Sequence, residues 1–416
     1  MRNFISDTIK STLSQIIGRS VNIVIPFFVI SYYGATSATD LFFLAMSVSF
    51  YFYGTISNAF NDTLSATYIV SRKYVSAKVI VIISFFAVLL TLAFLLCFSE
   101  VALTTDGIGM VVIFSVISGI GLTTIRSIPL LTAQKDFISP GLTWIFRGIP
   151  IILLAFFFRE EHQSIFILAA GILLADSVRA LLLEKLSEKH KSAVAKKLHL
   201  HEIYPMFVYI IGTLLQGLNP IVDRTIASFS ETGGVTILET ADRIFWTITM
   251  VLTTGIQSVM LVSISRYYSE GSFTRYIWKT IILTALGLGA VGSVLIFFFR
   301  IIVESQFGDL LFSSISLSDR MIISESLLYY ALLCPILAMS TACARVLIVA
   351  NKNFQIFKAC LLSLFLNTIL SIWFYLYFAI PGIVLGTLVS HVATFVYVCY
   401  MTKEILPHRR DSYINP

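Results

Sequence analysis

Apolar stretches about twenty residues long recur along the whole chain and are separated by short polar segments. A helix needs about 20 mainly apolar residues to cross the ~30 Å hydrocarbon core of a bilayer. The stretches lack the alternation of barrel strands, so each is predicted to be a membrane helix that satisfies its own backbone hydrogen bonds. The pattern predicts twelve spans, at residues 11–33, 40–68, 79–99, 107–131, 138–158, 164–183, 203–229, 234–265, 277–299, 321–350, 354–378 and 381–402.

The composition excludes a soluble globular protein. Hydrophobic residues make up 57% of the 416 residues and charged residues only 12%, and the mean hydropathy is +0.88. So few polar side chains cannot cover the surface of a water-soluble domain. We therefore predict an all-α polytopic membrane protein.

The cations divide unequally between the two sides of the predicted helices. If the amino terminus is cytoplasmic, nineteen Lys and Arg residues lie in inner loops and tails, against three in outer loops, Arg159, Arg300 and Arg320. Cytoplasmic loops are enriched in Lys and Arg. This predicts a multi-pass protein of the bacterial cytoplasmic (inner) membrane with both termini cytoplasmic. The net charge of +6 belongs to that asymmetry and indicates no nucleic-acid partner.

A polar, basic segment divides the chain near its middle. Residues 184–202 read EKLSEKHKSAVAKKLHLHE, with six predicted spans on either side. We interpret this segment as a cytoplasmic linker between two six-helix bundles, residues 1–183 and 203–416. Repeated bundles that enclose a central cavity are a common transporter plan, with the substrate site at their interface.

Charged residues inside the predicted spans are the candidates for function. A charge at the bilayer centre costs about 2.5–3.5 kcal/mol on insertion scales, so such side chains tend to face water or a partner. Spacing predicts pairing of Asp176 with Arg179 and of Glu239 with Arg243 on their own helices. The candidates are Arg19, Asp62, Arg126, Arg147, Asp176, Arg179, Asp223, Arg224, Glu239, Asp242, Arg243 and Arg345.

Four of these arginines are predicted to face a cavity and bind substrate: Arg19, Arg224, Arg243 and Arg345. Guanidinium groups bind phosphate in a forked geometry, so an excess of arginine favours an anionic, phosphorylated cargo. The alternative for every charged residue in a span is a structural ion pair. We favour that alternative for Asp62, Asp176 and Arg179, and leave it open for Arg126 and Arg147.

The remaining polar groups suggest no cofactor and no metal site. All five cysteines lie in apolar runs without metal-ligand spacing and are interpreted as packing residues. His391 is the one histidine inside a span, and a packed side chain is the preferred interpretation. A coupling ion, Na⁺ or H⁺, remains an open possibility, with Asp62, Asp223 and Glu239 as the carboxylates to test.

Two sequence stretches resemble the MurJ/MviN-type lipid flippases. The stretch NPIVDRTIASFSETGGVTILETADRIFWTITMVLTTGIQSVML (219–261) has an Asp, an Ala-Ser segment, a glycine turn and an Ala-Asp-Arg in the order of that family. The stretch YGATSATDLFFLA (33–45) is similar to the family's glycine turn followed by Ala-Thr-Asp and paired aromatics. The matching residues are Asp40, Asp223, Ala227, Ser228, Gly233, Ala241, Asp242 and Arg243.

The chain also departs from the family pattern. The first span retains one arginine, Arg19, of the family's Arg-x-x-Gly-x-x-Arg-Asp pattern, and residues 46–54 lack the family's basic residues. Flippases of the peptidoglycan precursor usually have fourteen spans, whereas twelve are typical of the related Wzx-type exporters of lipid-linked polysaccharide units. The resemblance therefore implies the flippase superfamily and leaves the cargo open.

The resemblance implies translocation of a polyprenyl-diphosphate-linked sugar by alternating access, without covalent chemistry. The four cavity arginines would hold the diphosphate. Asp40, Asp242, Glu239 and Asp223 would position arginines or gate the cavity, although an aspartate at a helix start also caps the helix. Implied partners are the lipid-linked substrate, membrane lipids, and glycosyltransferases or a polymerase of the same pathway.

Three other classes are weighed against this interpretation. A MATE-type cation-coupled drug exporter shares the twelve-span plan, but a cationic cargo favours carboxylates over the seven arginines and five acids counted among the candidates. An enzyme such as a polymerase would carry a long polar outer loop, and residues 300–320 are short and hold no histidine. An ATP-driven pump would need a Gly-rich phosphate loop with Lys-Ser/Thr, which the sequence lacks.

Overall fold

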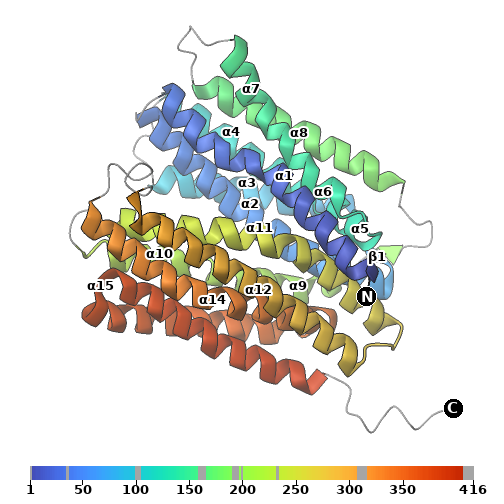
Figure 1. Cartoon of the computed structure of the whole chain (residues 1–416). Coiled ribbons are helices and arrows are strands. Elements are labelled where there is room, and N and C mark those ends of the chain that lie inside the picture. Colours follow the sequence, from blue (N-terminus) through green and yellow to red (C-terminus); the bar gives the residue numbers. More distant parts are fainter. Residues whose placement is uncertain are drawn as a thin grey trace, which may run out of the picture. The chain divides into compact units, whose positions relative to one another are not determined.

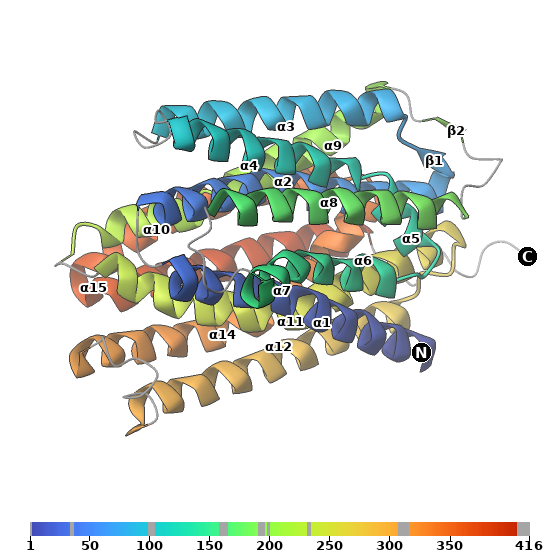
Figure 2. The same cartoon turned by 90° about the horizontal axis from the view of Figure 1, so that it is seen from above.

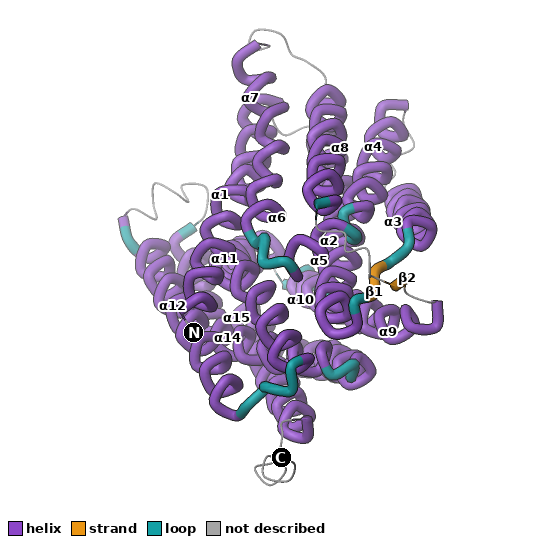
Figure 3. The backbone as a smooth tube through the Cα atoms, turned by 90° about the vertical axis from the view of Figure 1, so that its right-hand side faces the viewer, coloured by secondary structure: helices purple, strands orange, loops and turns teal. Residues whose placement is uncertain are grey.

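The structure, a computed structural model, describes residues 2–33, 37–98, 105–157, 165–189, 196–197, 200–230, 234–306 and 316–405. Helices make up nearly all of these ranges (Figures 1 and 3). Within them, seven helices are long and apolar enough to cross a membrane. The all-α polytopic fold class is thereby confirmed, while the number of twelve spans stays a prediction.

The chain forms two compact units, Met1–Ile203 and Tyr204–Pro416. The division comes directly after the basic segment at residues 184–202, although helix α8 continues into that segment as far as Glu188. Each unit is described by itself below.

Helix α4 packs against α2, α3 and α8 in unit 1 (Figure 2). Phe114 of α4 makes an edge-to-face ring contact with Phe42 of α2, and both side chains are fully buried. The helices of this unit are α1 (Arg2–Tyr33), α2 (Ser37–Ser71), α3 (Ala77–Phe98), α4 (Thr105–Thr123), α5 (Ser127–Ala133), α6 (Ile138–Leu142), the 3₁₀ helix η2 (Thr143–Arg147), α7 (Gly148–Phe157) and α8 (Ile165–Glu188).

Two spans predicted as continuous helices in unit 1 are interrupted. The predicted span 107–131 consists of α4 and α5, which are joined by a turn before Ser127. The predicted span 138–158 consists of α6, η2 and α7, with Pro140 and Pro150 inside it. Proline cannot donate a backbone hydrogen bond and clashes with the preceding turn. A segment with two prolines therefore forms short helices or a 3₁₀ turn instead of one continuous α-helix.

The basic inner segment contributes a small strand pair to unit 1. Strand β1 (Lys73–Tyr74) and strand β2 (Lys196–Lys197) pair in parallel, with Lys73 opposite Lys196. Part of the predicted linker is therefore attached by backbone hydrogen bonds to the loop after α2.

Helix α14 lies at the centre of unit 2, where it packs against α11, α12 and α15. Its Tyr330 stacks on Phe245 of α11, with ring centroids 4.4 Å apart. The helices of this unit are α9 (Leu200–Gln216, which begins just before the unit boundary), α10 (Asn219–Ala227), α11 (Gly234–Ser269), α12 (Arg275–Glu304), α14 (Leu317–Val349) and α15 (Asn353–Ile405).

Helix α15 is a tight antiparallel hairpin of two membrane helices. Its backbone is continuous except at Ala379, where φ is 51° and ψ is −136°. Gly386 in the second arm lies so close to the first arm that a Cβ atom there would be 2.6 Å from the backbone nitrogen of Ser371. The hairpin therefore joins the predicted spans 354–378 and 381–402 without an intervening loop.

Candidate functional site

An ion-pair cluster joins α10 and α11 in unit 2. Arg224 of α10 places Nη2 2.6 Å from Glu239 Oε2, and Arg243 places Nε 2.9 Å from Glu239 Oε1. The predicted pairing of Glu239 with Arg243, four residues apart on one helix, is confirmed. The structure adds that the same carboxylate also binds Arg224, so Glu239 holds both guanidinium groups in place.

Asp242 completes this cluster from the next turn of α11. It accepts a hydrogen bond of 2.9 Å from the Tyr330 hydroxyl and lies 3.5 Å from Arg224 Nη2. Tyr330 is nearly fully buried. The opening of α11 is thereby fixed against α14, and the positioning role of Asp242 stays a prediction.

The two arginines of the cluster remain accessible within unit 2. The Arg224 side chain is 39% exposed and that of Arg243 71% exposed. Among the described residues, Arg243 uses only Nε for a hydrogen bond, and its two terminal nitrogens bind no protein group. They can therefore donate to an external ligand in forked geometry.

The cluster carries no excess of positive charge. Two arginines, Arg224 and Arg243, face two carboxylates, Glu239 and Asp242, which gives a formal sum of zero. The sequence predicts an arginine excess at the substrate site, and these four groups do not supply it. An anion that binds here must therefore overcome the negative charge of Glu239 and Asp242, although Glu239 does not use the terminal nitrogens of Arg243.

Asp223 lies apart from this cluster, among polar side chains from both arms of α15. Its Oδ1 accepts hydrogen bonds from Asn367 at 2.8 Å and Ser371 at 3.2 Å, and its Oδ2 accepts one from Thr387 at 3.1 Å. The residue is 9% exposed. Asp223 and its neighbour Arg224 thus have different partners, as their positions on the helix predict.

Sequence reasoning missed the residues around Asp223. Asn367 and Ser371 are four apart in a largely apolar stretch, and Thr387 occupies the facing arm. Ser371 and Thr387 also donate to the Ile383 carbonyl, at 3.3 and 3.2 Å. A search for polar residues at helical spacing inside the spans, in addition to charged ones, would have found them.

The other two predicted substrate arginines, Arg345 and Arg19, are not part of the described cluster. Arg345 of α14 is 6% exposed and donates from Nη2 to Gln257 Oε1 of α11 at 3.2 Å. Arg19 belongs to α1 and Asp40 to the start of α2, but their side chains lie outside the described residues.

Unit 1 holds a second charged cluster, and here one predicted pair is wrong. Asp176 accepts two hydrogen bonds from Arg147, at 2.7 and 2.6 Å, and does not pair with Arg179. Arg179 instead donates to the Tyr53 hydroxyl at 3.2 Å and lies 3.8 Å from the centre of the Trp144 ring. Because η2 turns Arg147 toward α8, this arginine reaches both carboxylate oxygens in a fork.

The other charged candidates of unit 1, Arg126 and Asp62, have interaction partners within the protein. Arg126 lies 3.4 Å from Glu184, and Asp62 is half-buried and has an interaction partner. Tyr53 of α2 is buried and hydrogen-bonded to Arg179, so its side chain has a packing role in this unit.

Long apolar helices with charged clusters held between them define the chain as a polytopic membrane transporter. Residues 29–413 match the family model "Lipid II flippase MurJ". The chain therefore belongs to the lipid II flippase MurJ family, whose members are transporters rather than enzymes.

One curated relative and several solved structures are similar to the chain. The relative, "Probable lipid II flippase MurJ" of Buchnera aphidicola, is 23% identical, and the match covers 99% of this chain and 86% of that protein. The structure of lipid II flippase MurJ in an inward closed conformation has a TM-score of 0.59 at 17% identity and covers 96% of this chain and 87% of that chain.

A transporter of a different family has a similar fold. A mutant of the Vibrio cholerae MATE transporter VcmN gives a TM-score of 0.78 at 14% identity, with 97% of each chain covered. At this identity the likeness concerns the fold alone, so it does not compete with the family match. It does confirm that the chain has a fold used by polytopic transporters.

Proposed function

We propose that this chain flips a polyprenyl-diphosphate-linked sugar intermediate, either a surface polysaccharide unit or a peptidoglycan precursor, across the cytoplasmic membrane by alternating access. The observation that carries the proposal is the match of residues 29–413 to the lipid II flippase family. The transport cycle would move two six-helix bundles, residues 1–183 and 203–416, about a central cavity.

Within this function, Arg243 binds the diphosphate together with Arg224. Support comes from the exposed guanidinium of Arg243 and from its two terminal nitrogens, which are not used by the described part of the protein. Glu239 positions both arginines, and Asp242 fixes the helix that carries Arg243. Arg19 and Arg345 would also contact the phosphate groups during part of the transport cycle. Asp40 would position an arginine or cap the amino-terminal end of α2.

The test is translocation by the Arg243→Ala variant in sealed vesicles, measured as labelled lipid-linked sugar that reaches the outer face. We expect a loss of at least about tenfold, because a charge-assisted hydrogen bond contributes about 1.5–3 kcal/mol. The matched control is Arg300→Ala, which removes another arginine paired four residues away on its own helix, with Glu304 at 3.3 Å. Full activity of Arg243→Ala would contradict the assigned role.

A coupling ion is proposed to bind at Asp223. The carboxylate, the hydroxyls of Ser371 and Thr387 and the Ile383 carbonyl bring several oxygen atoms together, and no cationic side chain is among the described contacts of this carboxylate. Of the three carboxylates predicted for coupling, Glu239 is already bound to two arginines.

For Asp223→Asn we expect transport that no longer responds to an imposed Na⁺ or H⁺ gradient, because the amide keeps the size and loses the charge. The measurement compares initial transport rates with and without each gradient. The control is Asp62→Asn, which should keep the gradient dependence. Equal dependence in Asp223→Asn and the wild type would refute coupling at this site.

The alternative function is cation-coupled export of a small molecule, which the likeness to MATE transporters favours at the level of fold. The two functions differ in cargo charge. Efflux of a fluorescent cationic dye from vesicles, without flipping of lipid-linked sugar, would support the alternative.

The proposed location is the bacterial inner membrane with both termini cytoplasmic. In that orientation the basic pair Lys73 and Lys196 lies on the side where precursors are assembled. Glycosyltransferases or a polymerase of the same pathway are the proposed functional partners.

A further inference from the structure

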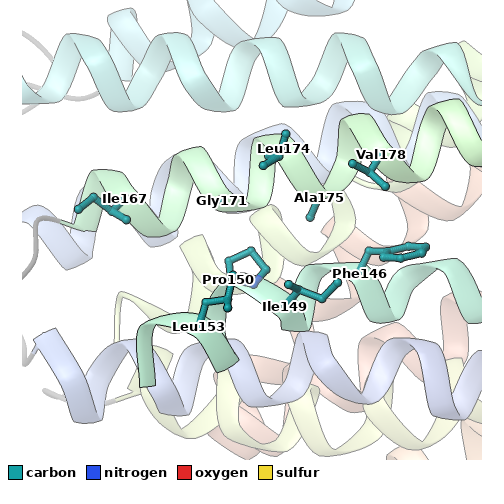
Figure 4. A pocket seen from close by; sticks show the side chains of 9 residues that line it. All are labelled: Phe146, Ile149, Pro150, Leu153, Ile167, Gly171, Leu174, Ala175 and Val178. Atoms are coloured by element: carbon teal, nitrogen blue, oxygen red, sulfur yellow. The ribbon is translucent and has the colours of Figure 1, made fainter. Parts of the chain in front are cut away.

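An apolar groove runs between α7 and α8 on unit 1, with a cavity volume of about 250 Å³. Ile149 and Leu153 form the α7 side, and Leu174 and Val178 belong to the α8 side (Figure 4). Leu174 is 67% exposed in this unit. Pockets for whole drug-sized ligands measure about 300–1,000 Å³, so the groove suits a segment of a chain better than a head group.

The floor of the groove is formed by the two smallest residues on this face of α8, Gly171 and Ala175. A Cβ atom at Gly171 would lie 2.7 Å from Pro150 of α7, so the glycine allows the two helices to approach closely. The small residues lie one turn apart between branched side chains. Methyl branches fill such a depression, whereas an unbranched chain leaves part of it empty.

The groove extends along about half of the membrane. From Ile167 to Val178 the rise of α8 is about 16 Å, against a hydrocarbon core of ~30 Å. Phe146 and Val178 lie together at the end of the groove that leads toward the carboxyl end of α8 (Figure 4).

Cations follow on the same face of α8. Lys185 is seven residues beyond Val178, which places it within about 20° of the same helix face and about 10 Å further along the axis. Lys185 and Lys189 are exposed, and two carboxylates, Glu184 and Glu188, lie beside them. Glu184 pairs with Arg126 at 3.4 Å, so the three cations and two carboxylates at this helix end give a formal net charge of +1. An apolar groove that continues into a basic helix end matches a lipid with a long chain and a phosphorylated head.

We propose that the α7–α8 groove is a binding site for a phosphorylated polyprenyl lipid, with branched C5 units in the groove and the phosphate at Lys185. This inference rests on the proposed function and extends it by assigning a place to the lipid part of the cargo. An ordinary phospholipid acyl chain is the competing occupant.

The test uses the full chain in vesicles of phosphatidylethanolamine and phosphatidylglycerol. The probe is a polyprenyl phosphate with a photoreactive group in its chain, and the labelled peptides are mapped by mass spectrometry. We expect labelling within residues 146–178, competed by unlabelled polyprenyl phosphate. Equal labelling of this segment by a photoreactive phosphatidylglycerol would identify an ordinary acyl-chain groove and overturn the proposal.

Variants test the site at both ends. Ala175→Phe fills the floor and should lower labelling at least about tenfold, which corresponds to 1.4 kcal/mol of binding. Ala170→Phe is the control, because Ala170 is exposed on α8 and lies outside the groove. If Ala175→Phe fails to fold, Leu174→Trp at the exposed mouth replaces it. Wild-type labelling in a folded groove variant would overturn the proposal.

The phosphate contact has its own measurement. Lys185→Gln should weaken competition by polyprenyl phosphate and leave competition by the uncharged polyprenol unchanged, and equal effects on both would refute the contact. The two proposals can fail separately. Lipid-linked sugar translocation by a wild type whose groove is not labelled rejects the groove site alone, whereas groove labelling without any translocation rejects the flippase function alone.

Discussion

At the scale of single residues, the Arg147–Asp176 pair illustrates how a charge is retained inside a membrane protein. Both side chains are 2% exposed, and the guanidinium also lies 4.3 Å from the centre of the Phe50 ring. Two charges withdrawn from solvent stabilise each other only if their geometry is good, because desolvation is costly. The fork between these residues satisfies that condition and ties η2 to α8.

Removal of one member of this pair should destabilise the protein strongly. We expect Arg147→Ala to cost about 3–5 kcal/mol, because Asp176 would be left buried without its partner. The control Arg126→Ala breaks a pair whose side chains are 27% and 34% exposed, and should cost less than about 1 kcal/mol. Unfolding in detergent, followed by circular dichroism, measures both. Equal losses in the two variants would contradict the burial argument.

Residue-scale prediction succeeded where the partner was local. The Glu239–Arg243 pair follows from a spacing of four residues, which the sequence displays directly. Asp176 could not be assigned in the same way, since its partner Arg147 comes from an earlier segment whose 3₁₀ geometry is not visible in the hydrophobic pattern. The hydrogen-bond partners of Asp223 come from both arms of the α15 hairpin, so they could not be predicted from spacing along one helix either.

At the scale of elements, the hydrophobic pattern predicted where the helices lie better than where they break. It placed membrane helices over every described long element, because burial in lipid requires an apolar run. It did not separate α9 from α10, which meet at Gly217 and Leu218, or α4 from α5. Such breaks depend on local turns whose freed backbone groups are satisfied by tertiary neighbours.

The α15 hairpin offers a test at this scale. Gly386→Ala should destabilise the protein by about 1–3 kcal/mol, because its Cβ would lie 2.6 Å from the Ser371 backbone nitrogen and must push the arms apart. The same substitution at Gly287 of α12 meets no atom within 4 Å and should be tolerated. Melting temperatures in one detergent compare the pair. A neutral Gly386→Ala would mean that the arms separate easily.

The hairpin also links packing to the candidate ion site. Asn367 and Ser371 belong to its first arm and Thr387 to its second, and all three bind Asp223 of α10. A shift between the arms therefore changes the polar groups around the carboxylate. Gly386→Ala is expected to weaken ion-dependent transport even in the folded fraction of the protein.

At the scale of the whole molecule, the chain matches the MurJ family model although a MATE transporter has a higher TM-score than a MurJ structure, 0.78 against 0.59, and the reason is physical. Helices that fill a bilayer-thick transporter adopt a limited set of packings, so a MATE protein reaches a TM-score of 0.78 with only 14% identity. The family match depends instead on which residues occupy the helices, over residues 29–413. Cargo is determined by those residues, and the flippase assignment therefore takes precedence over the fold likeness.

Depletion of the protein in living cells tests that assignment as a whole. A flippase moves a finished intermediate, so its loss should cause a lipid-linked sugar to accumulate on the inner face of the membrane within a few generations. Extraction of polyprenyl-linked intermediates and their analysis by mass spectrometry identify the sugar, and re-expression of the wild-type chain, but not of Arg243→Ala, should clear them. Re-expression of Arg300→Ala should also clear them, because the described contacts of Arg300 stay within α12 and α14, at Glu304 and Ser324. If depletion instead raises sensitivity to cationic compounds and no lipid-linked sugar accumulates, the cargo is a soluble cation and the arginine cluster of α10 and α11 has a structural role.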